Sequence, residues 1–257
     1  KLTDRNGRLL VLRPDNTTPI ARVVTTKLND DVLPLRLYYM QKVHRASSFH
    51  RGHSTEVMQA GAELLGARGM MADIDILTTA FAALAAVRGE TFRIELSYAA
   101  IYKELIQSLH VDAETAERIR SNIENKSYAA LGDELAPYQD REAYRALKAM
   151  PNLFGGSEVL DELAGLTDNP GVLKAVAYLK NLIDAITNAG YGENVMIDLG
   201  LVQEIDYYTG LMFRGYMGGA GSPVLAGGRY DNLCAKFGRD IPATGFAIDI
   251  DALSESV

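Results

Sequence analysis

Apolar and polar residues alternate in several segments of the first hundred positions, and such alternation is typical of half-buried β-strands. It predicts strands over residues 8–13, 36–43 and 55–65. The polar residues 46–54 then form the tip of a hairpin between the last two strands. Asn6-Gly7 predicts a tight turn before the first strand, because both turn positions favour a positive φ. Since this hairpin starts at the first residue, we expect an N-terminal segment to precede Lys1 in the whole protein.

The middle of the chain is dominated by apolar residues at helical spacing. One helix is predicted over 72–87, then a strand over 91–96, then a helical block over 99–189. Within this block, Asp112 and Ser157 are side chains suited to capping the N-terminus of a helix.

The most regular helix of the block is predicted to open at Asn169-Pro170, a capping residue followed by proline at the first helical position. Gly190 is predicted to end it, because glycine readily adopts the left-handed conformation found after helices. The periodicity is weaker over about 121–168, which we interpret as a helical insertion.

Strand patterns return after the helical block. They cover residues 194–203, 208–216, 223–226 and 244–250. No helices separate these strands, and parallel neighbours need a long crossover, so an antiparallel sheet is predicted. The expected fold class is α+β: an antiparallel sheet flanked by helices, forming one domain over 1–257 with a helical insertion.

The composition is that of a globular protein: 47% of the 257 residues are hydrophobic, 23% are charged, and the net charge is −7. A chain this acidic gains little from the counterion release that drives nucleic-acid binding. Its single cysteine, Cys234, excludes an internal disulfide and a cysteine metal cluster. A reducing cytoplasm is therefore expected, and the absence of a long apolar run predicts no membrane segment.

Two polar residues, Asp15 and Thr17, follow the first predicted strand and precede a helix expected to start at Pro19. They could simply cap that helix. Alternatively, they could face a pocket and accept hydrogen bonds from an ammonium group.

Gln59, Gly61 and Glu63 lie at alternate positions of a predicted strand and therefore share one face. A glycine between two polar side chains opens that face to a closely approaching ligand. A solvent-exposed face would explain the same pattern.

Two further motifs have alternative interpretations. Tyr207 and Tyr208, beside Asp206, could form the aromatic wall of a polar slot or could pack in the interior. The segment 227–231, GGRYD, could be a phosphate cradle at a helix N-terminus, or a tight turn in which Asp231 caps a helix.

Three histidines, His44, His50 and His53, cluster near the predicted hairpin tip. A zinc site is conceivable, but no acidic or cysteine ligand stands at a suitable spacing. Solvated loop histidines are the favoured interpretation, and no metal is expected.

Six segments, in chain order, resemble the catalytic core of class II histidyl-tRNA synthetases: LRPDNTTPIAR, YYMQKVHR, QAGAELLG, IDYYTG, GGRYDNL and TGFAIDIDAL. The resemblance implies a histidine pocket. The residues assigned to it are Asp15, Thr17, Gln59, Glu63, Tyr207 and Tyr208. In the synthetases the glutamine holds the α-amino group, and the glutamate and a tyrosine contact the imidazole.

The residues that bind ATP in the synthetases are mostly not kept in this chain. Gln203 stands where the synthetases have the arginine that stabilises the α-phosphate, and Glu204 replaces the adjacent glycine. Arg45 is kept, but its partner glutamate is Ser47, and Ala252 replaces the arginine that packs on ATP. Phosphoryl chemistry needs preorganised positive charge. We therefore expect neither adenylation nor aminoacylation, and no cofactor.

With these residues lost, the chain resembles the non-catalytic synthetase paralogues that regulate ATP phosphoribosyltransferase, the first enzyme of histidine biosynthesis. The resemblance implies a hetero-oligomer with a short-form catalytic subunit, feedback regulation by L-histidine, a self-dimer, and no anticodon-binding domain or nucleic-acid partner. Two alternatives stay open at this point. One is a catalytic-core fragment of a histidyl-tRNA synthetase, and the other is a structural activator with an empty pocket.

Overall fold

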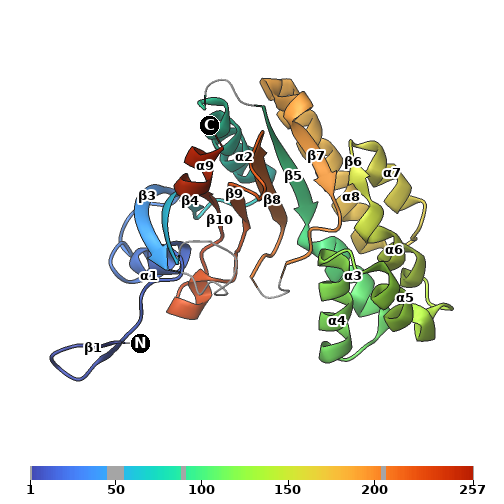
Figure 1. Ribbon diagram of the computed structural model, residues 1–257. Helices are drawn as coiled ribbons and strands as arrows, with labels where there is room; N and C mark the ends of the chain where they lie inside the picture. Colours follow the sequence, from blue (N-terminus) through green and yellow to red (C-terminus); the bar gives the residue numbers. More distant parts are fainter. Residues whose placement is uncertain (1, 45–54, 88–90, 204–206, 257) are drawn as a thin grey trace.

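One mixed β-sheet crosses the molecule in the computed structural model, which describes residues 2–44, 55–87, 91–203 and 207–256 (Figure 1). Within these residues the strand order is β3-β4-β10-β9-β8-β5-β7-β6. The strands are β3 (Leu35–His44), β4 (Glu56–Leu65), β5 (Phe92–Tyr98), β6 (Phe154–Gly155), β7 (Val195–Asp198), β8 (Leu211–Met217), β9 (Leu225–Arg229) and β10 (Ala243–Asp249).

The expectation of a purely antiparallel sheet is wrong at one pair of strands. β5 and β7 run parallel, with Ile94 opposite Val195, whereas the other neighbours are antiparallel. Parallel neighbours need a long crossover. The helical block between these two strands supplies it, so the segment predicted as an insertion is also a connection within the sheet.

Nine α-helices surround the sheet within the described residues. They are α1 (Thr17–Thr26), α2 (Met70–Ala85), α3 (Ala99–Leu109), α4 (Ala113–Glu124), α5 (Tyr128–Leu135), α6 (Ala143–Ala149), α7 (Glu158–Ala164), α8 (Pro170–Ile186) and α9 (Ile250–Glu255). α4 spans residue 121, so the predicted start of the insertion falls inside a helix.

Two of the predicted helix caps are confirmed. The Asp112 side chain accepts a hydrogen bond from the Thr115 N–H at the start of α4. Asn169 accepts from the N–H groups of Gly171 and Val172 at the start of α8. Ser157 occupies the N-cap position of α7 but makes no capping hydrogen bond with its side chain.

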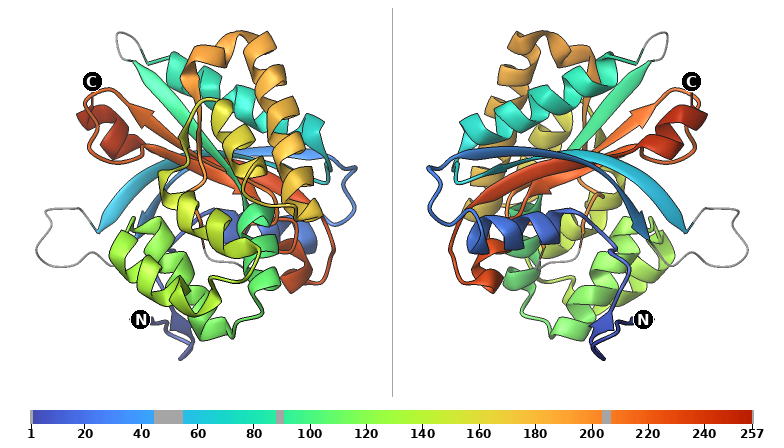
Figure 2. Two further views of the ribbon diagram at one scale, coloured as in Figure 1. Left: turned by 90° about the vertical axis from the view of Figure 1, so that its right-hand side faces the viewer. Right: turned by 90° about the vertical axis from the view of Figure 1, so that its left-hand side faces the viewer.

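The two sides of the sheet are covered differently (Figure 2). α2 and α8 lie on one side, where Leu77, Phe81 and Leu84 are fully buried in the main hydrophobic core. Each such side chain contributes about 1.5–3 kcal/mol through burial. α1 and α4 lie on the other side, and between them the sheet carries polar side chains such as Glu63. This arrangement places the candidate site on the second side.

The N-terminal hairpin is shorter than predicted. Only β1 (Leu2–Thr3) and β2 (Leu9–Leu10) pair, around a turn in which Gly7 has φ +76°. The hairpin stands away from the main sheet (Figure 1). Beyond β2 the chain approaches the end of β3, where the Arg13 carbonyl accepts a hydrogen bond from the His44 N–H at 2.8 Å.

Candidate functional site

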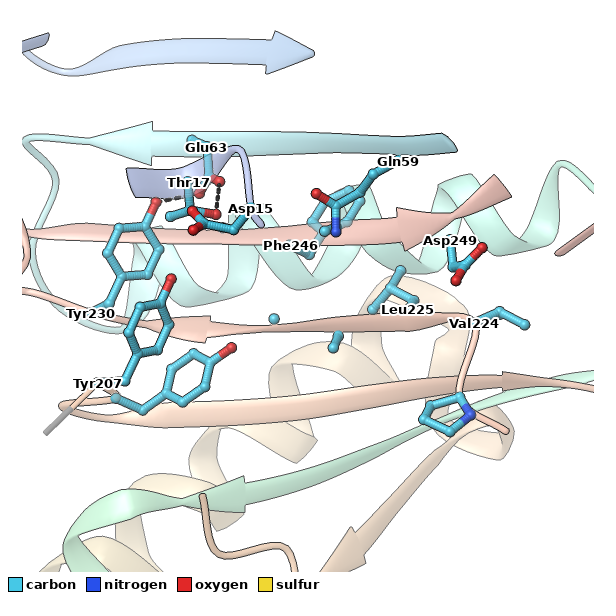
Figure 3. Close-up of a pocket in the computed structure, with 16 residues that line it drawn as sticks. Asp15, Thr17, Gln59, Glu63, Tyr207, Val224, Leu225, Tyr230, Phe246 and Asp249 are labelled. Atoms are coloured by element: carbon cyan, nitrogen blue, oxygen red, sulfur yellow. Dashed lines mark hydrogen bonds between the residues drawn. The ribbon is translucent and has the colours of Figure 1, made fainter. Parts of the chain in front are cut away.

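A cavity of about 200 Å³ opens on the sheet face opposite α2 and α8 (Figure 3). It brings together residues from β4, β9, β10, the start of α1 and the segment before β8. Its lining comprises Asp15, Thr17, Gln59, Glu63, Tyr207, Tyr208, Pro223, Val224, Leu225, Ala226, Gly227, Tyr230, Gly245, Phe246, Ala247 and Asp249. All six residues predicted to bind histidine therefore line one cavity.

The register between β4 and β10 builds the polar wall of the cavity. Glu63 lies opposite Gly245, and Gln59 lies opposite Asp249, so these side chains share one face. A Cβ atom added to Gly245 would lie 1.8 Å from Glu63 Oε2. Only glycine at position 245 therefore leaves room for the Glu63 carboxylate.

Glu63 is the most unusual ionisable group of the cavity. Its side chain is almost fully buried and accepts hydrogen bonds from Thr17 Oγ1, at 2.7 Å, and from the Tyr230 hydroxyl. Burial raises the pKa of Glu63 to about 7, although both hydrogen bonds oppose the rise and the charge of Asp15 adds to it. Near neutral pH this carboxyl group can accept a proton from, or donate one to, an imidazole nitrogen.

Asp15 and Thr17 combine the two interpretations left open by the sequence. Asp15 Oδ1 accepts a hydrogen bond from the Thr18 N–H at 2.7 Å, so it caps the first turn of α1. Its side chain also lines the cavity. Thr17 donates its hydroxyl proton to Glu63, and its oxygen keeps lone pairs for a ligand. α1 itself begins at Thr17, two residues before the predicted start.

Gln59 is held by a residue that the sequence motifs do not single out. Gln59 Oε1 accepts from Asn16 Nδ2 at 3.2 Å, and both side chains are buried. The interpretation of Gln59 and Glu63 as an exposed polar face is therefore wrong. Asn16 is the N-cap residue of α1 but makes no capping bond, because its side chain is turned to Gln59.

Three tyrosines form an aromatic wall. Tyr207 and Tyr208 meet edge to face with centroids 4.8 Å apart, and Tyr207 stacks on Tyr230 at 5.9 Å. Burial raises the pKa of Tyr208 to about 12, so its hydroxyl stays protonated. Tyr230 was not predicted as a site residue, although its motif was recognised. A Cβ at Gly228 would lie 2.6 Å from the Tyr208 ring, which explains this glycine.

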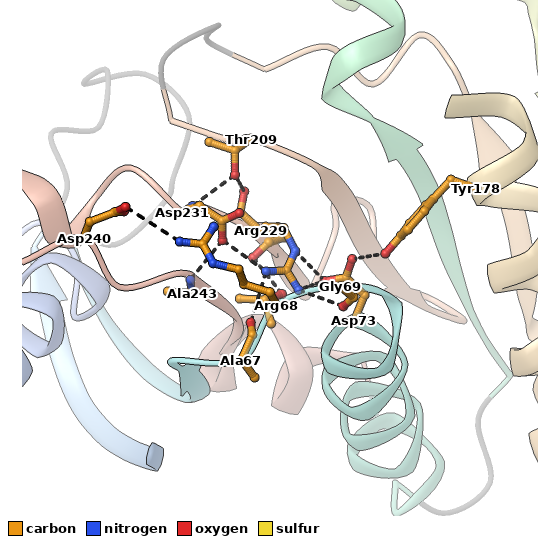
Figure 4. Close-up of polar contacts among 12 residues, drawn as sticks. Ala67, Arg68, Gly69, Asp73, Tyr178, Thr209, Arg229, Asp231, Asp240 and Ala243 are labelled. Carbon is orange, nitrogen blue, oxygen red and sulfur yellow. Dashed lines mark hydrogen bonds and ion pairs between the residues drawn. The ribbon is translucent and has the colours of Figure 1, made fainter. Parts of the chain in front are cut away.

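The phosphate-cradle interpretation of segment 227–231 is wrong, and so is the helix-cap interpretation of Asp231. Gly227 and Gly228 belong to β9, and the next helical turn begins only at Cys234. Arg229 is buried and donates through Nε and Nη2 to Asp73 Oδ1 at 3.0 and 2.7 Å (Figure 4). The motif therefore anchors the sheet to α2.

The structure describes two of the five residues predicted on the degenerate nucleotide side. Gln203 lies outside the main cavity, in a small space shared with Lys103 and Tyr208. Ala252 is on α9 and packs against the main core. The other three, Arg45, Ser47 and Glu204, lie outside the described residues.

Asp249, which the sequence motifs did not mark as a site residue, lines the far end of the cavity (Figure 3). Its Oδ1 accepts from the Ala252 N–H at 2.9 Å and caps α9. Together with Asp15 and Glu63 it makes three carboxyl groups in the cavity. Among the described residues that line it, none is lysine, arginine or histidine. This charge distribution suits a cationic group such as an alkylammonium.

The described residues contain no group of three histidine, cysteine or acidic side chains that could hold a metal ion. His44 lies 3.3 Å from Glu56, whereas His50 and His53 lie outside the described residues. In the same part of the chain no helix is long and apolar enough to cross a membrane.

The family model for histidyl-tRNA synthetase matches residues 1–253. The chain is also 41% identical, over its whole length, to the ATP phosphoribosyltransferase regulatory subunit of Clostridium kluyveri. It spans 66% of that relative, slightly under two thirds.

Solved structures show the same fold. An ATP phosphoribosyltransferase regulatory subunit/histidyl-tRNA synthetase from Bacillus halodurans C superposes with a TM-score of 0.90 at 34% identity, covering 99% of this chain and 67% of the other. An ATP phosphoribosyl transferase complex from Thermotoga maritima reaches a TM-score of 0.73 at 19% identity, covering 96% and 84%, and shows the fold alone. The chain therefore belongs to the histidyl-tRNA synthetase family, within which it is similar to ATP phosphoribosyltransferase regulatory subunits.

Proposed function

We propose that the whole protein is a non-catalytic regulatory subunit of ATP phosphoribosyltransferase and that its cavity binds L-histidine. The name and 41% identity of the Clostridium kluyveri relative support the regulatory role. The observation that carries the ligand is the cavity itself, in which the six predicted residues meet around the buried carboxyl group of Glu63.

The polar groups match the parts of histidine. An imidazole can share a hydrogen bond with Glu63 and rest against the tyrosine wall near Tyr208. The α-ammonium can donate to the side chains of Asp15, Thr17 and Gln59. This polar set argues against a purely structural activator with an empty pocket.

The same cavity is unsuited to adenylation. A phosphoryl-transfer site needs preorganised positive charge, and the described lining offers three carboxyl groups with no basic side chain. Asp249 adds negative charge at the end away from the tyrosine wall. This supports a regulatory subunit over a catalytic fragment of a synthetase.

A self-dimer is proposed from exposed apolar side chains on the N-terminal hairpin and on the edge strand β3. Tyr38 is 90% exposed, and Met40 shares its face of the strand. Val11 and Leu12 lie beside Gln41 of β3 and are also exposed. Exposed apolar surface along an open edge strand favours pairing with another chain.

Reconstitution tests the proposed function. The whole protein is mixed with the catalytic ATP phosphoribosyltransferase subunit of the same organism, and phosphoribosyl transfer is measured with and without histidine. We expect a complex, phosphoribosyl transfer that depends on it, and inhibition by histidine. In cell extracts, both subunits should be found in the cytoplasmic fraction. Suppose that the complex forms but histidine does not inhibit it, and that calorimetry detects no histidine binding to the isolated protein. This result would refute the proposed ligand but not the proposed partner.

A further inference from the structure

An arginine lies in the same row of the sheet as the floor of the cavity. Gly61 of β4 pairs with Ala247 of β10, Ala247 with Ala226 of β9, and Ala226 with Arg214 of β8. Directly paired residues point to the same side of a sheet. Arg214 therefore stands on the cavity side, beyond a floor of small residues.

The width of this floor suits an amino acid. Three strand spacings of about 4.8 Å separate β4 from β8, roughly 14 Å in all. The side chain of Glu63 extends into this gap from β4, and that of Arg214 stands at its other margin. A ligand of histidine's length can lie between these two side chains.

In the structure Arg214 is held by the helical block. Its Nη2 lies 3.0 Å from Glu124 Oε1 near the C-terminal end of α4. Glu124 Oε2 also pairs with Arg120 Nη1 at 2.6 Å, and that nitrogen donates to the Val202 carbonyl. About a quarter of each side chain of the Arg214–Glu124 pair is exposed, so the pair can open without exposing a core.

The charge of Arg214 already acts within the cavity. The pKa of Tyr208, which burial and the charge of Glu63 raise, is lowered in part by the positive charge of Arg214. Tyr208 is itself tied to the helical block, because Lys103 of α3 donates to its backbone carbonyl at 3.0 Å. Arg214, Tyr208 and two helices of the block are thus neighbours.

A zwitterionic ligand poses a problem for this cavity. Its ammonium meets three carboxyl groups, but the described lining holds no cation for its carboxylate. An unpaired carboxylate in a desolvated site is costly. We infer that Arg214 receives the carboxylate of the bound amino acid and leaves Glu124 when it does so, which makes the Arg214–Glu124 pair a sensor of occupancy linked to α4.

The inference rests on the proposed binding of histidine in this cavity. It assigns to Arg214 a role in choosing an α-amino acid over the corresponding amine or alcohol. Ligand binding would also change the contacts of the helical block, because Glu124 of α4 loses one of its two arginine partners whenever the ligand is bound.

The inference is tested by comparing two ligands on the wild-type protein and on a variant of Arg214. Calorimetry measures binding of histidine and of histidinol, in which a hydroxymethyl group replaces the carboxylate. The wild-type protein should prefer histidine. Arg214→Met should weaken histidine binding roughly ten- to a hundredfold, as expected for loss of a charge-assisted bond, and leave histidinol within about threefold.

Three controls sharpen the result. Arg214→Lys should keep the preference for histidine. Arg118→Met removes an arginine from α4 that pairs with Glu114 and Glu134 instead of Glu124, and should change neither affinity. Glu124→Gln frees Arg214 and should strengthen histidine binding severalfold without affecting histidinol. In the reconstituted complex, Arg214→Met should also lose inhibition by histidine.

The outcomes separate the inference from the function beneath it. If wild-type protein binds neither ligand, the proposed pocket fails and the inference fails with it. If both ligands bind and Arg214→Met leaves their ratio unchanged, or weakens both equally, the pocket stands and the role of Arg214 is overturned.

Discussion

At the scale of single residues, the properties of Glu63 follow from its neighbours. It enters the cavity over a glycine, and its two oxygens accept from Thr17 and Tyr230. These contacts hold a carboxyl group in a place where its charge is poorly solvated, which is why its pKa lies near 7. Two predictions concern this residue.

Glu63→Ala should abolish histidine sensing and leave the protein folded. The change leaves a polar ligand atom unpaired in a desolvated slot, which costs on the order of 1–3 kcal/mol, or roughly ten- to a hundredfold in affinity. Calorimetric titration of the isolated variant measures this. Activation of the catalytic subunit should survive if it depends on contact and not on ligand. Wild-type affinity in the variant would place the histidine site elsewhere.

Glu63→Gln should change how stability depends on pH. In the wild-type protein the folded pKa of about 7 lies above the unfolded value of 4.5, so the folded state keeps a proton that the unfolded state has lost. Stability due to this group is full below pH 4.5 and falls as pH rises to 7, by on the order of 3 kcal/mol.

The glutamine variant has no such proton. Urea unfolding between pH 5 and 8 should therefore show wild-type protein losing stability relative to the variant as pH rises. If the difference in unfolding free energy between the two proteins stays constant across this range, the pKa of Glu63 is not raised. The slope is the informative quantity, because glutamine also disturbs the two hydrogen bonds.

At the scale of elements, helix ends and one buried ion pair set the framework around the cavity. α8 is capped by Asn169, whereas the N-cap Ser157 of α7 makes no side-chain capping bond. Asn169 and Ser157 therefore allow a comparison of an N-cap residue with a capping bond and one without. Arg229, in turn, joins β9 to α2 through Asp73, which also accepts from Tyr178 of α8 at 2.5 Å.

Asn169→Ala should lower the free energy of unfolding by about 1 kcal/mol, since its side chain satisfies two backbone N–H groups of α8. Ser157→Ala should change it by less than about 0.5 kcal/mol. Chemical denaturation of both variants measures the contrast. Equal losses would show that the capping bonds of Asn169 contribute nothing particular.

Arg229→Met should lower the free energy of unfolding by about 3–5 kcal/mol, because it leaves the buried Asp73 carboxylate without a countercharge, with the Tyr178 hydroxyl still donating to it. The double variant Asp73→Leu/Arg229→Met should recover part of that loss, since no uncompensated charge remains. A double-mutant cycle from urea unfolding provides the test. Additive losses would indicate that the pair is not coupled.

At the scale of the whole molecule, one face of a mixed sheet carries the cavity and the other carries the core. The helical block that connects β5 to β7 reaches round to the cavity side, where α4 holds Arg214. The helical block and the cavity are therefore connected through one sheet.

The protein should not catalyse histidine-dependent pyrophosphate exchange, and Gln203→Arg alone should not restore it. Gln203 stands outside the main cavity, whose carboxyl groups oppose a polyphosphate whichever residue occupies that position. The exchange assay uses a histidyl-tRNA synthetase as its positive control. Activity of synthetase size in either protein would contradict the charge argument.

The sequence alone determined much of this protein, wherever the deciding forces are local. Alternation located β3 and β4 within one residue at either end, and the caps Asp112 and Asn169 were found where their chemistry placed them. The six pocket residues came from the family resemblance of their motifs, and they do meet in one cavity.

The tertiary structure decided what depends on pairing between distant segments. Strand order and register decide three features: the parallel β5–β7 pair, the use of Arg229 as an anchor for Asp73, and the position of Asp249 and Arg214 on the same side of the sheet. A one-residue shift of register would turn each of these side chains to the opposite face. Register is set by contacts across the whole sheet, so no local pattern of apolar and polar residues specifies it.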